Sequence, residues 1–192
     1  MESTLMTPTV PTLDILMAPA ARELARPEPG EFAWATRMDL RARSKLLIID
    51  DEPTNVRIVQ RLLELEGYRH FASTCDSRDG LALIEEEQPD CVLLDLMMPY
   101  VSGLDLLEGI RQEPSLRSVP VVVLTASTDR KMRTDALAKG ATDFLNKPVD
   151  PAELAPRLAN VLAAKSYYDQ LQRCRMELDQ ALALVNERSL AH

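Results

Sequence analysis

Five polar residues, each at or just past the end of a short apolar segment, could together carry out group transfer: Asp50, Asp51, Asp95, Thr125 and Lys147. Carboxylates that lie a few ångströms apart repel one another unless a cation lies near them. Mg²⁺ accepts one or two carboxylates, keeps several waters and suits sites that also hold phosphate. The lysine adds a positive charge for an anionic group, and the threonine adds a hydroxyl donor. These residue types indicate phosphoryl transfer to a carboxylate, which forms an aspartyl phosphate.

Five apolar segments must position these side chains. They are too short for buried helices, so we expect strands at Leu46–Ile49, Arg69–Thr74, Cys91–Leu94, Val119–Leu124 and Thr142–Leu145. Amphipathic segments between and after them predict five helices, which begin near Pro53, Asp79, Leu104, Thr128 and Pro151. This alternation predicts an α/β fold with a doubly wound, five-stranded parallel sheet that is covered on both faces. Ligands of such sheets bind outside the carboxyl ends of the strands, so the five polar residues should meet at one edge.

The first 44 residues differ in character from the rest. They contain prolines at positions 8, 11, 19, 27 and 29 and sustain no periodicity, so we expect a disordered tail at 1–44. The alternative is a docking peptide around residues 13–17 or around Phe32 and Trp34.

The last helix should continue well beyond the sheet, because no Gly or Pro follows Leu162. A heptad repeat counted from Leu154 assigns these residues: a, Leu154, Val161, Tyr168, Arg175 and Leu182; d, Arg157, Ala164, Leu171, Leu178 and Val185. From Val161 onward this pattern predicts a parallel two-stranded coiled coil with one charged flaw at Arg175. The alternative is a single solvated helix. We therefore expect a homodimer that forms through this C-terminal helix.

Composition excludes several classes of protein. A formal charge of −8 argues against a nucleic-acid surface. No apolar stretch is long enough for a membrane span, and the N-terminus lacks the features of a secretory signal. The three widely spaced cysteines suit reduced thiols in the cytoplasm better than disulfides or a metal site. We expect a cytoplasmic protein without membrane contact.

Four motifs in this order resemble the receiver domain of two-component response regulators: Ile49-Asp50-Asp51-Glu52-Pro53, Leu94-Asp95-Leu96-Met97-Met98-Pro99 with Gly103 eight residues after the acid, Leu124-Thr125-Ala126, and Ala141-Thr142-Asp143-Phe144-Leu145-Asn146-Lys147-Pro148. The resemblance covers about residues 45–165 and implies the flavodoxin-like (βα)5 fold. It leaves 1–44 as the tail and 166–192 as a helical, coiled-coil extension.

By this resemblance, seven residues take on roles: Asp95 as phosphoacceptor; Asp50, Asp51, Asp95 and the Met97 backbone carbonyl as Mg²⁺ ligands; Thr125 and Lys147 as phosphoryl-binding groups; Thr125 and Phe144 as the switch. The residues alone leave open two alternatives in which these side chains have only a structural role. Asp50 or Asp51 could cap the first helix, and Lys147 could be a solvated turn residue. Phe144 would be a core aromatic in either case. Met97 and Ser127 occupy positions that tune water access in the family, and Met97 cannot orient a water, which predicts a long-lived phosphoryl group.

The implied function is a response regulator that accepts a phosphoryl group from a sensor histidine kinase or a phosphotransfer protein. The receiver would then relay the signal through a change in its dimer and coiled coil. No catalytic motif and no DNA-binding helix-turn-helix follows, so we expect neither an enzyme nor a nucleic-acid partner within this chain. Two alternatives stay open. The chain could be the N-terminal regulatory part of a longer cyclic-di-GMP synthase or phosphodiesterase, or a scaffold that works without phosphorylation.

Overall fold

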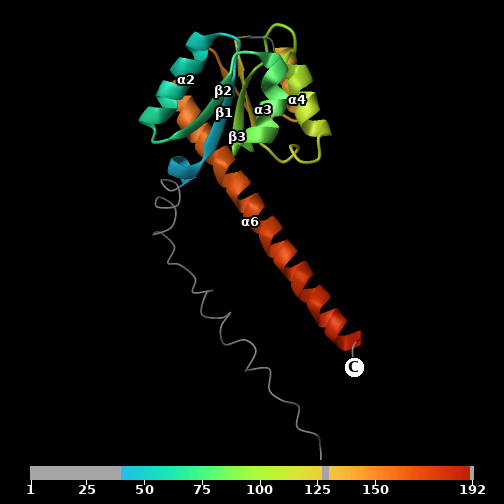
Figure 1. The fold of residues 1–192 in the computed structure, drawn as a ribbon. Coiled ribbons are helices and arrows are strands. Elements are labelled where there is room, and N and C mark those ends of the chain that lie inside the picture. Colours follow the sequence, from blue (N-terminus) through green and yellow to red (C-terminus); the bar gives the residue numbers. More distant parts are fainter. Residues whose placement is uncertain (1–39, 127–129, 191–192) are drawn as a thin grey trace, which may run out of the picture. The chain divides into compact units, whose positions relative to one another are not determined.

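A computed structural model describes residues 40–126 and 130–190 and contains one five-stranded parallel sheet (Figure 1). The strands are β1 (Lys45–Ile49), β2 (His70–Thr74), β3 (Cys91–Asp95), β4 (Val121–Thr125) and β5 (Asp143–Asn146). Their order across the sheet is β2-β1-β3-β4-β5, so the direction of winding reverses at β1. The predicted doubly wound parallel sheet is therefore confirmed, with its switch point between β1 and β3.

Strand register explains why the predicted site residues meet. Ile49 pairs with Leu94, so the next residues, Asp50 and Asp95, lie side by side at the ends of the neighbouring strands β1 and β3. Thr125 pairs with Asn146 at the end of β4 and β5, so Lys147 emerges beside Thr125. The carboxyl edge of the sheet thus collects side chains from four segments that are far apart in the sequence.

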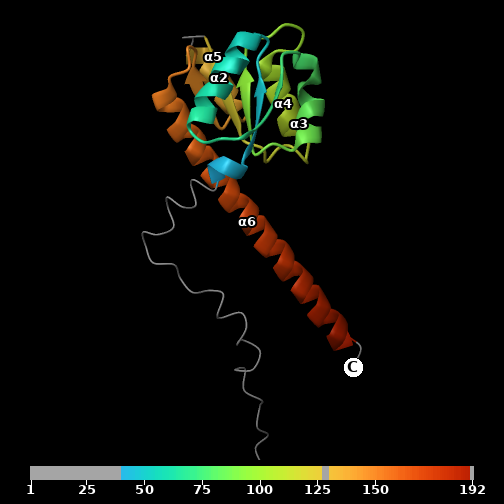
Figure 2. The same ribbon diagram turned by 60° about the vertical axis from the view of Figure 1, so that its left-hand side comes forward.

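The helices are α2 (Pro53–Leu65), α3 (Gly80–Glu87), α4 (Gly103–Gln112), α5 (Arg130–Ala138) and α6 (Pro151–Leu190), with a 3₁₀ turn η3 (Ser77–Asp79) before α3. They flank the sheet in Figures 1 and 2. One core cluster packs α2 and the first turns of α6 on the sheet, and a second packs α3, α4 and α5 on it. Both faces are therefore covered, as the near-continuous apolar strands require.

The fourth strand begins two residues later than predicted. Val119 lies in a turn, where its N–H donates to the Leu116 carbonyl and its own carbonyl accepts from the Arg111 guanidinium. Pro120 has no N–H to give to a ladder. These bonds use the backbone of Val119 for the turn, so β4 starts at Val121.

Helix α6 has two different parts. Its first turns bury Leu154, Leu158, Val161 and Leu162 against the sheet. From Ser166 to Ala183 the side chains are partly or largely exposed, and this part of the helix runs away from the sheet in both views (Figures 1 and 2). The long C-terminal helix is thus confirmed, whereas its pairing into a coiled coil stays a prediction.

The predicted tail lies almost wholly outside the described residues. Within it, residues 40–43 are helical, Ser44 is buried, and the Arg41 guanidinium binds the carbonyl and carboxylate of Glu66. The described structure therefore includes a short helical turn before β1. Among the described helices, none combines the length and apolar character needed to cross a bilayer.

Candidate phosphoacceptor site

The centre of the site is the ammonium group of Lys147, which bridges two acids. Its Nζ lies 2.6 Å from Oδ2 of Asp50 and 2.7 Å from Oδ2 of Asp95. The side chains of Asp50 and Asp95 are 0% and 6% exposed, and that of Lys147 is 15% exposed. Lys147 is therefore no solvated turn residue, because buried carboxylates of this kind need a partner.

On the side away from Lys147, Asp50 contacts the first turn of helix α2 and the residue before that helix. Its Oδ1 accepts from the Glu52 backbone N–H at 3.1 Å and from the Asn55 side-chain amide at 3.0 Å. The Glu52 side chain forms no cap bond. Asp50 thus does shape the start of the helix, as one alternative held, but its second oxygen remains directed at the lysine. The sequence pattern did not reveal this contact of Asn55 with the acid.

Three carboxylates lie close enough to share a cation. Oxygens of Asp50, Asp51 and Asp95 all lie within 4.8 Å of one another. Oδ2 of Asp50 is fully buried and accepts no well-aligned hydrogen bond from the described residues, although the Lys147 charge is near it. Asp51 is more exposed than the other two, which leaves room for water on one side. This all-oxygen, partly open donor set fits Mg²⁺.

The electrostatics of the site favour added positive charge. Burial raises the pKa of Asp95, and the neighbouring Asp50 adds to this, while Lys147 and the Met97 N–H oppose it. Burial alone would lower the pKa of Lys147, but the two carboxylates outweigh it and raise that pKa. The lysine therefore stays charged at neutral pH. Burial disfavours the ionised form of Asp95, and a bound cation would favour that form.

The loop after Asp95 is held close to the acid by backbone contacts. The Gly103 N–H donates to the Leu96 carbonyl, and a Cβ on Gly103 would lie only 2.1 Å from the Asp95 carbonyl oxygen. Ser77 is buried, donates to the Pro99 carbonyl at 2.5 Å and accepts from the Val101 N–H at 3.1 Å. Sequence reasoning found Gly103 as part of a motif but did not find Ser77.

Met97 and Thr125 flank the acid differently. The Met97 N–H donates to Oδ1 of Asp95 at 3.3 Å, and its side chain is 60% exposed. Thr125 is fully buried, and its carbonyl accepts from the Lys147 N–H at 2.8 Å, which ties β4 to the lysine. Ser127 lies outside the described residues.

Phe144 lies on the face of the sheet that α5 covers. It is half-buried and packs against the core cluster of α3, α4 and α5. The Arg133 guanidinium of α5 lies 5.3 Å from its ring centroid. The aromatic ring is therefore placed between β5 and α5, two residues before the strand ends at Asn146.

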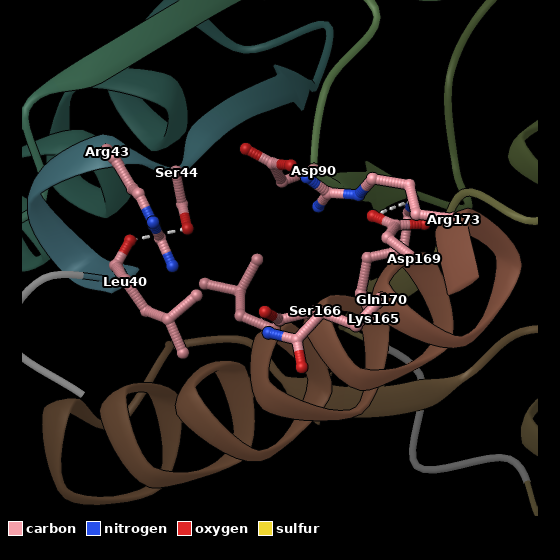
Figure 3. Close-up of a pocket in the computed structure, with 10 residues that line it drawn as sticks. Leu40, Arg43, Ser44, Asp90, Lys165, Ser166, Asp169, Gln170 and Arg173 are labelled. Carbon is pink, nitrogen blue, oxygen red and sulfur yellow. Dashed lines mark hydrogen bonds and ion pairs between the residues drawn. The ribbon is translucent and has the colours of Figure 1, made fainter. Parts of the chain in front are cut away.

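One hollow of about 410 Å³ lies elsewhere and takes no part in this chemistry (Figure 3). It is lined by Arg43 and Ser44 before β1, by Asp90 before β3, and by α6 residues that include the ion pair Lys165–Asp169. These strand starts lie at the amino edge of the sheet, opposite the acids.

The fold and the acid cluster at the carboxyl edge define a receiver domain, and comparison with known proteins agrees. Residues 46–159 match the response regulator receiver domain family, so this chain belongs to that family. It is a signalling domain of two-component systems.

Individual relatives cover the same part of the chain. Response regulator PleD of Caulobacter vibrioides is 34% identical over 130 residues, which is 68% of this chain and 28% of PleD. A probable transcriptional regulator, ycf27 of Porphyridium aerugineum, is 38% identical over 120 residues, which is 62% of this chain and 48% of that protein. This chain thus spans between about a quarter and a half of the length of these curated relatives.

Solved structures share the fold. A putative response regulator from Chloroflexus aurantiacus superposes with a TM-score of 0.60 at 32% identity, covering 62% of this chain and 98% of that one. Chemotaxis protein CheY4 of Vibrio cholerae gives a TM-score of 0.58 at 28% identity, covering 62% and 99%. Both likenesses cover less than two thirds of this chain, whereas almost all of the other chain is matched.

Proposed function

We propose that this receiver accepts a phosphoryl group on Asp95 from a sensor histidine kinase or a phosphotransfer protein, in a Mg²⁺-dependent reaction. The observation that carries this proposal is the position of the Lys147 ammonium between the buried carboxylates of Asp50 and Asp95. Family membership supports the class of donor, because receiver domains pair with such proteins.

Each residue of the site would contribute one function. An Asp95 carboxylate oxygen attacks the phosphorus of a phosphohistidine, the P–N bond breaks, and the leaving imidazole takes up a proton. Lys147 pairs with a phosphoryl oxygen, and the Thr125 hydroxyl donates to another. Asp50, Asp51, Asp95 and the Met97 carbonyl would hold the Mg²⁺, which when bound neutralises the charge of the phosphoryl group.

The signal would leave the site through a switch. The phosphoryl group carries roughly −2 charge beside two acids, and drawing Thr125 towards it leaves space near Phe144. Phe144 then packs further inward and changes the face formed by α5, β5 and α6. A change of this kind biases two states of one fold rather than creating a new fold.

The output would be a homodimer that forms through a parallel coiled coil of α6. The division into a tail at 1–44, a receiver at 45–165 and a helical extension at 166–192 belongs to this proposal. So do the cytoplasmic location and the absence of nucleic-acid and membrane partners. The free thiols of Cys75, Cys91 and Cys174 suit a reducing compartment.

Beryllofluoride with Mg²⁺, a mimic of the aspartyl phosphate, tests the proposal on the full chain. We expect beryllofluoride to bind and light scattering to report a shift in mass from monomer to dimer. Asp95→Asn is the control and should not respond. Wild-type protein that binds neither Mg²⁺ nor beryllofluoride would refute the assignment of the site, whereas binding without a change in mass would refute only the dimer relay.

A second candidate rests on the length of the relatives. Because the chain spans 28% of PleD and 48% of ycf27, the receiver could regulate further domains, for example those of a cyclic-di-GMP synthase or phosphodiesterase. Sequencing the gene past the codon for His192 separates this from the first proposal. A scaffold that works without phosphorylation would instead signal normally with Asp95→Asn.

A further inference from the structure

The exposed part of α6 carries a short apolar seam. Its layers are Tyr168, Leu171, Arg175, Leu178 and Leu182, and the side chains of Leu171, Leu178 and Leu182 are 69%, 60% and 53% exposed. Four of these five layers are large and apolar, whereas five of the six charged residues between 165 and 183 lie outside the seam. Such a stripe is the pattern that a second helix covers.

Charge on this stretch favours a second copy of the chain as the partner. Residues 165–183 contain three basic and three acidic side chains, so their net charge is zero, although the whole chain carries −8. Two such helices can approach in parallel without net repulsion. A self-complementary heptad pattern makes a second copy the partner of matching chemistry.

Arg175 stands at the middle of the five layers. Its side chain is 74% exposed, and its Nε lies 3.9 Å from Oδ2 of Asp179 on the same helix. This distance is too long for a hydrogen bond. In a parallel coil, the two Arg175 side chains would face each other and divide the seam into two short parts. Tyr168 and Leu171 lie before Arg175, and Leu178 and Leu182, followed by Val185 in the heptad repeat, lie after it. Neither part is long enough to be stable alone.

We propose that Arg175 is the residue that sets the threshold of dimerisation. It makes the α6 seam too weak to pair in the unphosphorylated chain, so that pairing requires an additional contribution from the receiver. This inference rests on the proposed dimer relay and adds a regulatory residue to it. A polar group at one a position is known to lower coiled-coil stability in return for control of register.

The test compares Arg175→Leu with Arg173→Leu in the full chain. Arg173 lies two residues away at an f position of the heptad, outside the seam, where it lines the hollow shared with Asp90. Its replacement therefore removes the same charge without changing an a or d residue. We expect Arg175→Leu to dimerise at least about tenfold more tightly without beryllofluoride, measured by sedimentation equilibrium, while Arg173→Leu matches wild type. Equal association of Arg175→Leu and wild type would overturn the inference.

Two further variants separate this inference from the proposed function. Adding Leu178→Asp to Arg175→Leu should abolish the gain; a gain that persists would show that the new dimer does not use the seam, which also overturns the inference. Leu182→Cys, in a Cys75→Ser and Cys174→Ser background, should form a disulfide-linked dimer in the parallel arrangement. If Arg175→Leu dimerises through the seam but wild type ignores beryllofluoride, the threshold role stands and the phosphorylation relay fails.

Discussion

Replacing Lys147 by methionine should destabilise the receiver more than any change to a surface charge. The variant keeps the length of the side chain but leaves Asp50 and Asp95, which are 0% and 6% exposed, without the ammonium that lies between them. Breaking a buried ion pair by removing one partner costs roughly 3–5 kcal/mol. Because the site opens to solvent at Asp51, we expect the lower end, about 3 kcal/mol, or roughly 10 °C in Tm.

The assay is urea unfolding followed by far-UV circular dichroism at pH 7 in EDTA. Lys139→Met is the matched control, because the Lys139–Glu108 pair is exposed at the surface and its loss should leave stability unchanged. Mg²⁺ should then stabilise Lys147→Met more than wild type, since a cation can take over the neutralising role of the lysine. If Lys147→Met is as stable as wild type in EDTA, the lysine does not balance the two carboxylates.

Three more predictions concern the acid and its loop. Burial raises the folded-state pKa of Asp95, so above that pKa its negative charge lowers the stability of the fold. We therefore expect Asp95→Asn to be more stable than wild type at pH 7 in EDTA. This difference in the free energy of unfolding should close as the pH falls through the raised pKa. Gly103→Ala forces a Cβ against the Asp95 backbone. It should lower the free energy of unfolding by about 2 kcal/mol in chemical denaturation and weaken beryllofluoride binding. The control Gly109→Ala meets only the flexible Leu81 side chain and should retain that binding. The phosphoryl group should be lost slowly from purified protein in Mg²⁺, and faster from Met97→Asn, as followed by radiolabel; rapid loss from wild type would contradict the role of the thioether.

The sequence predicts the sheet well because the three central strands, β1, β3 and β4, are buried on both faces. Near-continuous apolar runs leave little choice of structure, and the acids at their ends then meet by topology alone. The distances among Asp50, Asp95 and Lys147 follow from strand register, which no single run of residues reveals.

Contacts between distant loops were not predictable in the same way. Ser77 binds the backbone on both sides of Tyr100, and Asn55 reaches back to Asp50, yet serine and asparagine are ordinary residues at turns and helix starts. Their role depends on which loop lies opposite, so composition and periodicity carry no signal for it. Asn55 could have been suspected from its position five residues after the acid, at the first turn of α2.

Strand β5 is the element in which the site, the switch face and the long helix meet. Asp143 binds Arg157 of α6, with both carboxylate oxygens 3.1 Å from one guanidinium nitrogen. Phe144, the next residue, packs on the opposite face towards α5, because successive residues of a strand alternate. Lys147 follows directly after the strand and binds both acids. A shift of the lysine towards a phosphoryl group would therefore act on four residues of backbone that contact α5 on one side and α6 on the other.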